Sequence, residues 1–216
     1  SNGGADAYVL ANQPDNNLGS SDEIDVKGYT DQRRISYIQF NISSIPSNQA
    51  IDNSLLCLYL FSDSGSQTIS AHQVYAGWLE SNITWNNQPC GGNFDNSTNC
   101  NLTAESSLSN DGNQDNTWQC WNITNMVKKQ YTENKKNVSI VVRTQDTVNY
   151  IDKFYSKEYS DSSLWPYLNI TYQISDMIAP SFSNYIENPT NNSAYALGHA
   201  YKFNVTINET NPGIVW

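Results

Sequence analysis

The stretch Tyr37–Ile42 reads Tyr-Ile-Gln-Phe-Asn-Ile, so that every second side chain is aliphatic or phenyl. Successive side chains of a β-strand point to opposite faces of its sheet, so Ile38, Phe40 and Ile42 are predicted to face a core. The Tyr, Gln and Asn of the stretch then lie on the solvated face. Pro46 lacks a backbone donor and ends the segment in a turn. The stretch therefore predicts a half-buried strand of an all-β domain.

Five further stretches have the same period-two pattern with β-branched and aromatic residues. They cover residues 54–61, 68–75, 138–144, 153–159 and 167–174, and turn-rich sequence separates them. Many short strands with little helix favour a β-sandwich, most specifically a jelly roll.

One short helix is predicted over residues 123–132. Thr124 or Asn125 is suited to cap its first turn, because either side chain can accept a hydrogen bond from a free backbone N–H. The apolar spacing places Met126, Val127 and the pair Gln130-Tyr131 on its inner edge.

The pattern changes near residues 176–180, where Asp-Met-Ile-Ala-Pro is typical of a linker. Beyond it, residues 194–197 and 201–207 resemble the opening strands of an immunoglobulin-like domain. Residues 181–216 are too few to bury a self-sufficient core, so we expect downstream sequence or a strand from a neighbouring subunit to complete them. The predicted organisation is a jelly-roll domain over 1–175, a linker over 176–180, and a partial immunoglobulin-like domain over 181–216.

The composition excludes several classes of partner. The formal net charge is −10, with 11 Lys plus Arg against 21 Asp plus Glu. Nucleic acid and anionic membranes both require clustered cations, so neither is expected as a partner. No apolar run reaches the roughly 18–20 residues of a membrane helix, so no direct membrane insertion is expected in this segment.

Ten Asn-X-Ser/Thr triplets mark acceptors for N-linked glycan, which is added only to chains that enter a glycosylating compartment. They begin at Asn41, Asn82, Asn96, Asn101, Asn122, Asn137, Asn169, Asn191, Asn204 and Asn208. A β-protein rich in Asn, Ser and Thr also contains such triplets by chance, because of its composition alone. Those in predicted loops, at Asn96, Asn101 and Asn191, are the best supported. The set indicates an extracellular or cell-surface glycoprotein.

The four cysteines allow three disulfide pairings, and their spacing contains no Cys-X-X-Cys zinc motif. In an oxidising compartment we expect Cys90 to pair with Cys100 around a short loop, and Cys57 to pair with Cys120. The alternative is four free thiols in a reducing cytosol.

Several short segments occur in an order that resembles one known family. They read Ala-Asp-Ala-Tyr-Val at 5–9, Asn-Leu-Gly at 17–19, Arg-Ile-Ser-Tyr-Ile-Gln-Phe-Asn-Ile-Ser-Ser-Ile-Pro at 34–46, Trp-Leu-Glu at 78–80, Ile-Thr-Trp-Asn-Asn-Gln-Pro at 83–89, Trp-Asn-Ile-Thr at 121–124, Phe-Tyr-Ser-Lys-Glu at 154–158 and Pro-Tyr-Leu-Asn-Ile at 166–170. They are similar to the DNRLRE, or disaggregatase-related, domain, which is akin to a carbohydrate-binding-module family of bacterial and methanogen surface proteins. The resemblance covers about residues 3–174. It implies a non-catalytic jelly roll on a secreted protein.

Some members of that family bind acidic polysaccharide such as alginate through basic residues. The matching stretch here keeps Arg34, with Arg33 and Lys27 nearby, but the chain has few other cations. Sugar rings could also stack on Trp118 and Trp121. The alternatives are that these tryptophans pack in the core and that Arg34 pairs with a buried carboxylate.

A calcium site is predicted at Asp111, Asn113 and Asp115, because alternate oxygen-bearing side chains suit a hard cation on a loop. Asp22, Glu23 and Asp25 form a second acidic cluster. Such stretches are also common as solvated turns. N-linked glycan and calcium are the only non-protein components expected.

The chain offers little for catalysis. It contains no HExxH or GxSxG motif and only two histidines, His72 and His199. A glycosidase needs two carboxylates, and Glu80 with Glu158 would be the candidates. No catalytic residue is assigned, and the chain is predicted not to be an enzyme.

Two functions follow from these patterns. The first is a structural or adhesive module of a surface layer, sheath or filament, with other copies of itself or neighbouring surface proteins as partners. The alternative is a carbohydrate-binding module of a secreted polysaccharide-active protein, with polysaccharide as partner.

Overall fold

A computed structural model describes residues 4–173, 181–188, 190, 194, 197–198 and 200–208. The chain divides into two compact units, Ser1–Gln173 and Ile174–Trp216. Each unit is described by itself below. The predicted linker at 176–180 lies outside the described residues, so the predicted boundaries stay a prediction.

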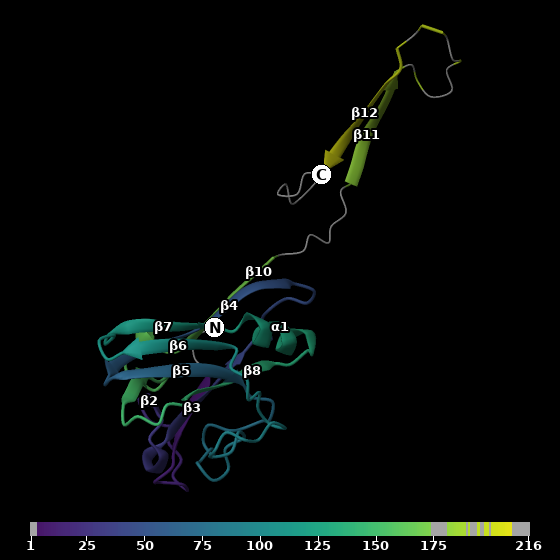
Figure 1. The fold of residues 1–216 in the computed structure, drawn as a ribbon. Coiled ribbons are helices and arrows are strands. Elements are labelled where there is room, and N and C mark those ends of the chain that lie inside the picture. The colour runs from purple at the N-terminus through teal and green to yellow at the C-terminus, as the bar shows by residue number, and fades with distance from the viewer. Residues whose placement is uncertain are drawn as a thin grey trace. The chain divides into compact units, whose positions relative to one another are not determined.

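The first unit is an antiparallel β-structure with one short helix (Figure 1). Its elements are β1 (Ala5–Leu10), β2 (Glu23–Lys27), β3 (Arg34–Asn41), β4 (Ala50–Asp63), β5 (Ser66–Gln73), β6 (Ser106–Asp111), β7 (Thr117–Asn122), α1 (Thr124–Thr132), β8 (Asn137–Thr144), β9 (Ile151–Tyr155) and β10 (Tyr167–Gln173), with 3-10 turns at Thr30–Gln32 and Ser162–Leu164. The strands form a ten-stranded sheet in the order β10-β4-β9-β2-β3-β8-β5-β6, with β1 beside β3 and β7 beside β4. The predicted all-β class with one short helix is confirmed.

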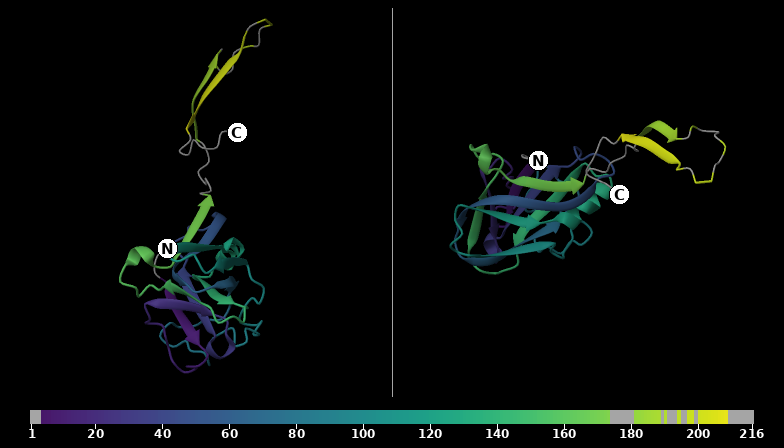
Figure 2. Two further views of the ribbon diagram at one scale, coloured as in Figure 1. Left: turned by 60° about the vertical axis from the view of Figure 1, so that its left-hand side comes forward. Right: turned by 90° about the horizontal axis from the view of Figure 1, so that it is seen from above.

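The sheet curls so that its strands enclose one main core (Figure 2). Leu58 and Leu60 of β4 and Phe154 of β9 are fully buried there. They pack in the same cluster as Ile38 and Phe40 of β3. The two β3 residues are those that the alternation at 37–42 predicts to face inward.

A second core covers the opposite face of β1, β3 and β8. The long segment between β5 and β6, residues 74–105, lies over this face and contributes Ile83 and Phe94 to it. Tyr37 was predicted to face solvent, and this is wrong. It is completely buried and donates a hydrogen bond from its hydroxyl to Gln88 Oε1 at 3.0 Å. The pattern of one strand could not reveal that a distant segment covers its polar side.

The four cysteines form two disulfides, Cys57–Cys120 and Cys90–Cys100. The first joins β4 to β7, where the two residues are direct partners in the strand register. The second closes a ten-residue separation inside the long segment. These are the pairs expected from the sequence.

Helix α1 begins at Thr124 and buries Met126, Val127 and Gln130 as expected, with Tyr131 partly buried against the core. The expected capping by Thr124 or Asn125 is not observed, because Ile123 is the N-cap residue and its side chain makes no capping hydrogen bond. Asn122 Oδ1 accepts a hydrogen bond from Thr124 N at 3.1 Å. Glu105 instead accepts a hydrogen bond from Met126 N at 3.0 Å. The start of the helix is therefore capped by Asn122 and by the segment that precedes β6.

The second unit contains β11 (Ser181–Asn188) and β12 (Lys202–Asn208), which pair antiparallel. Large apolar side chains on both strands are exposed, among them Phe203 at 73%. Two paired strands do not establish an immunoglobulin-like domain, which therefore remains a prediction. Residues 195 and 196, inside the range 194–197 where one of its strands was expected, lie outside the described residues.

Within the part of the chain that the structure describes, no helix is both long and apolar enough to cross a membrane.

Candidate functional site

Aromatic side chains gather on the outer face of the strands β4, β7, β9 and β10 and in the turn after β9. We call the set the aromatic face, and it consists of Tyr59, Phe61, Trp118, Tyr155, Tyr159 and Tyr167. All six are half-buried, so each ring keeps accessible surface. A clustered, accessible aromatic surface of this kind marks a binding site more often than a packing defect.

Strand alternation explains why these rings point outward. Leu58 and Leu60 of β4 face the main core, which leaves Tyr59 and Phe61 on the other side. The same alternation directs Phe154 inward and Tyr155 outward on β9. The fold therefore places five of the six rings on strands, and the sixth, Tyr159, lies in the turn that follows β9.

The rings form two connected groups. Tyr155 stacks on Tyr159 with ring centroids 3.6 Å apart and on Phe61 at 4.4 Å. Trp118 meets Tyr59 edge-to-face at 5.3 Å and Tyr167 at 4.9 Å. A further stacked contact between Tyr59 and Tyr155 at 5.9 Å joins the groups. Rings held by such mutual contacts lose little freedom when a ligand binds.

Polar groups border the aromatic face at β2 and β9. Lys153 and Glu23 form an ion pair at 2.8 Å, and Glu23 is the direct strand partner of Tyr155. Hydrogen bonding with Tyr159 raises the pKa of Tyr155 to about 12. Trp165 Nε1 donates to the backbone oxygen of Tyr159 at 2.6 Å, which anchors the segment that carries that ring.

Flat stacked rings with hydroxyl and charged groups at their border are suited to bind sugars, whose C–H faces are apolar and whose edges carry hydroxyls. The family model of carbohydrate-binding module family 96 matches residues 1–172. The chain belongs to carbohydrate-binding module family 96. This family implies a carbohydrate-binding role and is typically non-catalytic. The name DNRLRE is not confirmed, and no curated protein matches the chain.

In this family 96 module, the predicted basic residues are engaged within the protein. Arg34 Nη1 forms an ion pair with Asp25, whose side chain is fully buried, and the guanidinium lies 5.8 Å from the centre of the Tyr8 ring. Burial raises the pKa of Asp25 to about 6, even though Arg34 opposes this shift. Arg34 therefore acts as the partner of a buried carboxylate, which was one of its two expected roles.

Lys27 is the direct strand partner of Arg34, but Lys27, Arg33 and Arg34 do not form a free basic surface. Lys27 Nζ donates to Gln32 Oε1 at 2.7 Å, and burial lowers the pKa of this lysine. Arg33 Nη1 donates to the backbone oxygen of Gly92 at 2.8 Å, in the long segment on the other side of the sheet. The three cations thus serve three different local contacts.

The two predicted tryptophans separate completely. Trp118 belongs to the aromatic face, whereas Trp121 is only 1% exposed and donates from Nε1 to Ile69 O at 3.0 Å. The prediction that Trp121 contacts sugar is therefore wrong. The two residues are three positions apart on β7, and an odd spacing places them on opposite sides of the sheet.

In the predicted calcium loop, the carboxylates accept hydrogen bonds from backbone N–H groups of the loop and of β4. Asp111 Oδ1 accepts from Asn113 N at 3.0 Å, and Asp115 Oδ1 accepts from Asp63 N at 2.5 Å. The second acidic cluster is split between ion pairs, with Glu23 on Lys153 and Asp25 on Arg34. Among the described residues, the carboxylates that converge closely enough for a metal are Asp6, Glu80 and Glu158 instead.

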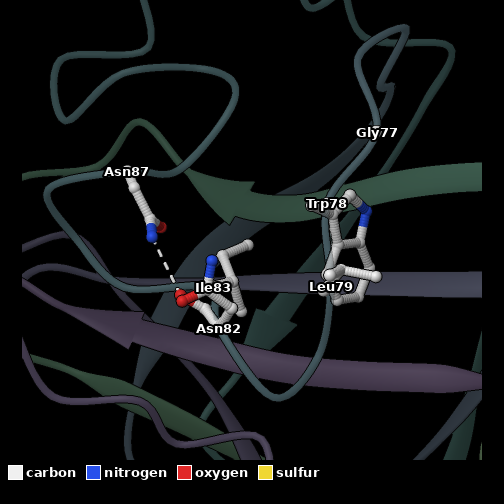
Figure 3. Close-up of a pocket in the computed structure, with 6 residues that line it drawn as sticks. All are labelled: Gly77, Trp78, Leu79, Asn82, Ile83 and Asn87. Atoms are coloured by element: carbon white, nitrogen blue, oxygen red, sulfur yellow. Dashed lines mark hydrogen bonds between the residues drawn. The ribbon is translucent and has the colours of Figure 1, made fainter.

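A pocket of about 440 Å³ lies in the long segment, away from the aromatic face (Figure 3). Trp78, Leu79, Asn82 and Ile83 line it, and Asn87 Nδ2 donates to Asn82 O at 2.8 Å across its wall. Its single ring, Trp78, is already tied to Ser139 Oγ by a 2.7 Å hydrogen bond. The aromatic face offers more stacking surface and is the stronger candidate for sugar.

Nine of the ten acceptor asparagines lie among the described residues, and Asn191 lies outside them. Seven are exposed, while Asn96 and Asn101 are half-buried. At Asn41 and Asn122 the amide oxygen accepts hydrogen bonds from the residue two positions later, which leaves Nδ2 free to point outward. The geometry is compatible with the predicted glycans.

Sequence reasoning did not single out Tyr59, Phe61, Tyr155, Tyr159 or Tyr167. The available signal was that Tyr59 and Phe61 alternate with Leu58 and Leu60, which predicts one aromatic and one aliphatic face. What could not be read from sequence was that four strands bring their outer rings together. That result depends on pairing β4 with β7, β9 and β10.

Proposed function

We propose that this module binds a neutral polysaccharide on the aromatic face. The observation that carries the proposal is the set of six contacting rings on the outer side of β4, β7, β9 and β10 and in the turn after β9. Sugar rings would stack on Trp118, while phenol hydroxyls and the Lys153–Glu23 pair would bond the sugar edges. The Tyr155 ring, stacked between Phe61 and Tyr159, supports this surface.

Charge favours a neutral ligand over an acidic one. The net charge of −10 repels polyanions at long range. Lys153, the cation at the border of the aromatic face, is already paired with Glu23 at 2.8 Å. An alginate-like chain would find no unpaired ammonium there, whereas a neutral glucan, xylan or galactan needs none.

Retardation in polyacrylamide gels that contain one polysaccharide tests this proposal. The full chain is run against neutral glucan, xylan and galactan and against alginate, with and without calcium. Retardation by at least one neutral polymer that survives 0.5 M salt is expected. Retardation by alginate alone, lost in salt, or by no polymer at all, would contradict the proposal.

A structural or adhesive role in a cell-surface assembly is a second proposal, with secretion and N-glycosylation as its setting. Its support is the second unit, where Phe182, Phe203 and Ile207 are exposed on a two-stranded sheet that is marginal alone. A strand from a neighbouring copy would cover them. Sedimentation of the full chain tests this: self-association that Phe203→Ser reduces is expected, and a strictly monomeric chain would contradict it.

A further inference from the structure

Three carboxylates converge from parts of the chain that are far apart in sequence. Asp6 lies on β1, Glu80 in the long segment, and Glu158 just after β9. Each contributes one oxygen to a group whose atoms all lie within 4.8 Å of one another. The sequence offered Glu80 and Glu158 only as a glycosidase pair, and Asp6 not at all.

The local backbone is built to hold Glu80 in this position. Asn17 Nδ2 donates to the backbone oxygens of both Glu80 and Ile83, at 2.7 and 2.8 Å. Gly19 lies so close that a Cβ there would come within 2.2 Å of the Glu80 oxygen. The contact leaves no room for a side chain, so this loop position requires glycine.

Two carboxylate oxygens of the cluster have no hydrogen-bond partner within the protein. Asp6 N donates to Glu80 Oε1 at 2.7 Å, and Lys157 N donates to Asp6 Oδ2 at 3.0 Å. Lys157 Nζ pairs with Glu80 Oε1 at 3.0 Å and with Glu158 Oε1. Asp6 Oδ1 and Glu158 Oε2 are buried and have no hydrogen-bond partner.

The cluster also has more negative than positive charge. Lys157 supplies one positive charge against three carboxylates, and Asp6 is only 2% exposed. Burial, with the neighbouring Glu158 and Glu80 charges, raises the pKa of Asp6 to about 7. A buried carboxylate without a partner costs several kcal/mol unless a proton or a cation neutralises it.

We propose that Asp6, Glu80 and Glu158 bind a calcium ion. Hard cations take carboxylate oxygens, and calcium–oxygen bonds of about 2.4 Å allow ligands on opposite sides of the ion to lie about 4.8 Å apart. The two unpartnered oxygens, Asp6 Oδ1 and Glu158 Oε2, would then coordinate the ion. The Lys157 side chain, 22% exposed at the border of the cluster, turns toward solvent when the ion enters.

Such an ion would join the first strand of the module to the segment between β9 and β10. Asp6 and Lys157 already make contact over a separation of 151 residues. An ion that binds the native state and not the unfolded chain stabilises the fold by about 2.7 kcal/mol at a concentration 100 times its Kd. The site is therefore structural, and it does not depend on the proposed sugar binding.

Thermal unfolding of the full chain after chelator treatment tests the site, with isothermal titration of CaCl2 as the direct measurement. Calcium is expected to raise the Tm of the wild type more than magnesium does. Glu158→Gln and Asp6→Asn should abolish the calcium shift, and Glu133→Gln, an exposed change of equal charge, should keep it. In chelator, Asp6→Asn should unfold at or above the wild-type Tm, because the amide needs no counter-ion.

The variant Lys157→Gln tests whether calcium or the Lys157 ammonium neutralises the three carboxylates. If the ammonium competes with calcium, the variant binds calcium more tightly than the wild type and recovers its stability when calcium is added. An unchanged wild-type Tm at millimolar calcium would overturn the site. So would an equal shift with magnesium, or a calcium shift that persists in Asp6→Asn and Glu158→Gln.

Discussion

Tyr59 and Trp118 are direct partners across β4 and β7, with their rings edge-to-face and the centroids 5.3 Å apart. Two residues along the same strands, Cys57 and Cys120 are also direct partners and form a disulfide. The disulfide therefore fixes the two strands that carry the centre of the aromatic face. The disulfide, the strand register and the proposed ligand surface therefore all involve the same pair of strands.

Loss of the Cys57–Cys120 disulfide should weaken both stability and sugar binding. Its 63-residue separation predicts a loss of about 4 kcal/mol in the free energy of unfolding for Cys57→Ser/Cys120→Ser. Cys90→Ser/Cys100→Ser opens a ten-residue separation, so it should cost about 3 kcal/mol or less and leave sugar affinity unchanged. Urea unfolding and polysaccharide titration measure both effects. Equal losses of affinity in the two double variants would contradict the link to the aromatic face.

Asp152 should make stability fall as pH rises. It is completely buried opposite Asp63, its Oδ2 accepts from Asn110 Nδ2 at 2.5 Å, and burial raises its pKa to about 7. A folded-state pKa above the unfolded value of about 3.9 gives stability that is complete below pH 4 and is lost as the pH passes 7.

Asp152→Asn imitates the protonated acid, so its free energy of unfolding should fall less between pH 5 and pH 8 than that of the wild type. The difference has an upper limit of about 1.4 kcal/mol per pH unit. Asp111→Asn, at an exposed position, is the matched control and should follow the wild type. Parallel pH profiles for wild type and Asp152→Asn would show that Asp152 does not titrate in this range.

Glycan at Asn122 or Asn169 should limit access to the aromatic face. Both asparagines are direct strand partners of Leu55. Two residues further along β4, Cys57 pairs with Cys120 and Tyr167 in the same way. Asn122 is four residues from Trp118 along β7, which is about 13 Å.

In chain produced with N-glycan, Asn122→Gln/Asn169→Gln should therefore bind polysaccharide more tightly, as measured by gel retardation. Asn41→Gln removes a triplet at the end of β3 and should have no effect. Intact mass before and after deglycosylation shows which sites are occupied. If Asn122 or Asn169 carries glycan and affinity does not change in the double variant, the proposed position of the ligand is wrong.

Trp121→Ala tests the assignment of this residue to the core. Removal of a buried tryptophan, together with its 3.0 Å bond to Ile69 O, should cost about 3–5 kcal/mol of stability. Differential scanning calorimetry should show a large fall in Tm. A change of less than about 1 kcal/mol would be incompatible with the packing seen here.

Much of the fold was predictable because it is local. The alternation at 37–42 correctly placed Ile38 and Phe40 in the core, and the apolar spacing located α1 to within one residue. Strands β1, β2, β6, β7 and β11 were missed. Short polar segments such as Ser106–Asp111 carry no periodic apolar signal. These strands form because neighbours supply their hydrogen bonds.

The candidate site was harder to predict because it depends on contacts between distant segments. Trp118 was identified from residue type alone, but Trp121 looked identical until strand alternation separated the two. Arg34 was recognised from the family stretch, while its partner Asp25 was assigned to an acidic cluster. The convergence of Asp6 with Glu80 and Glu158 spans nearly the whole module, and no local pattern encodes it.

The affinity of Trp118→Ala for the polysaccharide retained by the wild type is the most direct test of the central claim. Truncation of a central interface aromatic should weaken binding at least tenfold, by about 1.4 kcal/mol or more, and Trp118→Phe should retain part of it. Tyr29→Ala, an exposed tyrosine outside the aromatic face, is the control and should bind like the wild type. If Trp118→Ala stays folded and binds with wild-type affinity, the aromatic face is not the sugar-binding site.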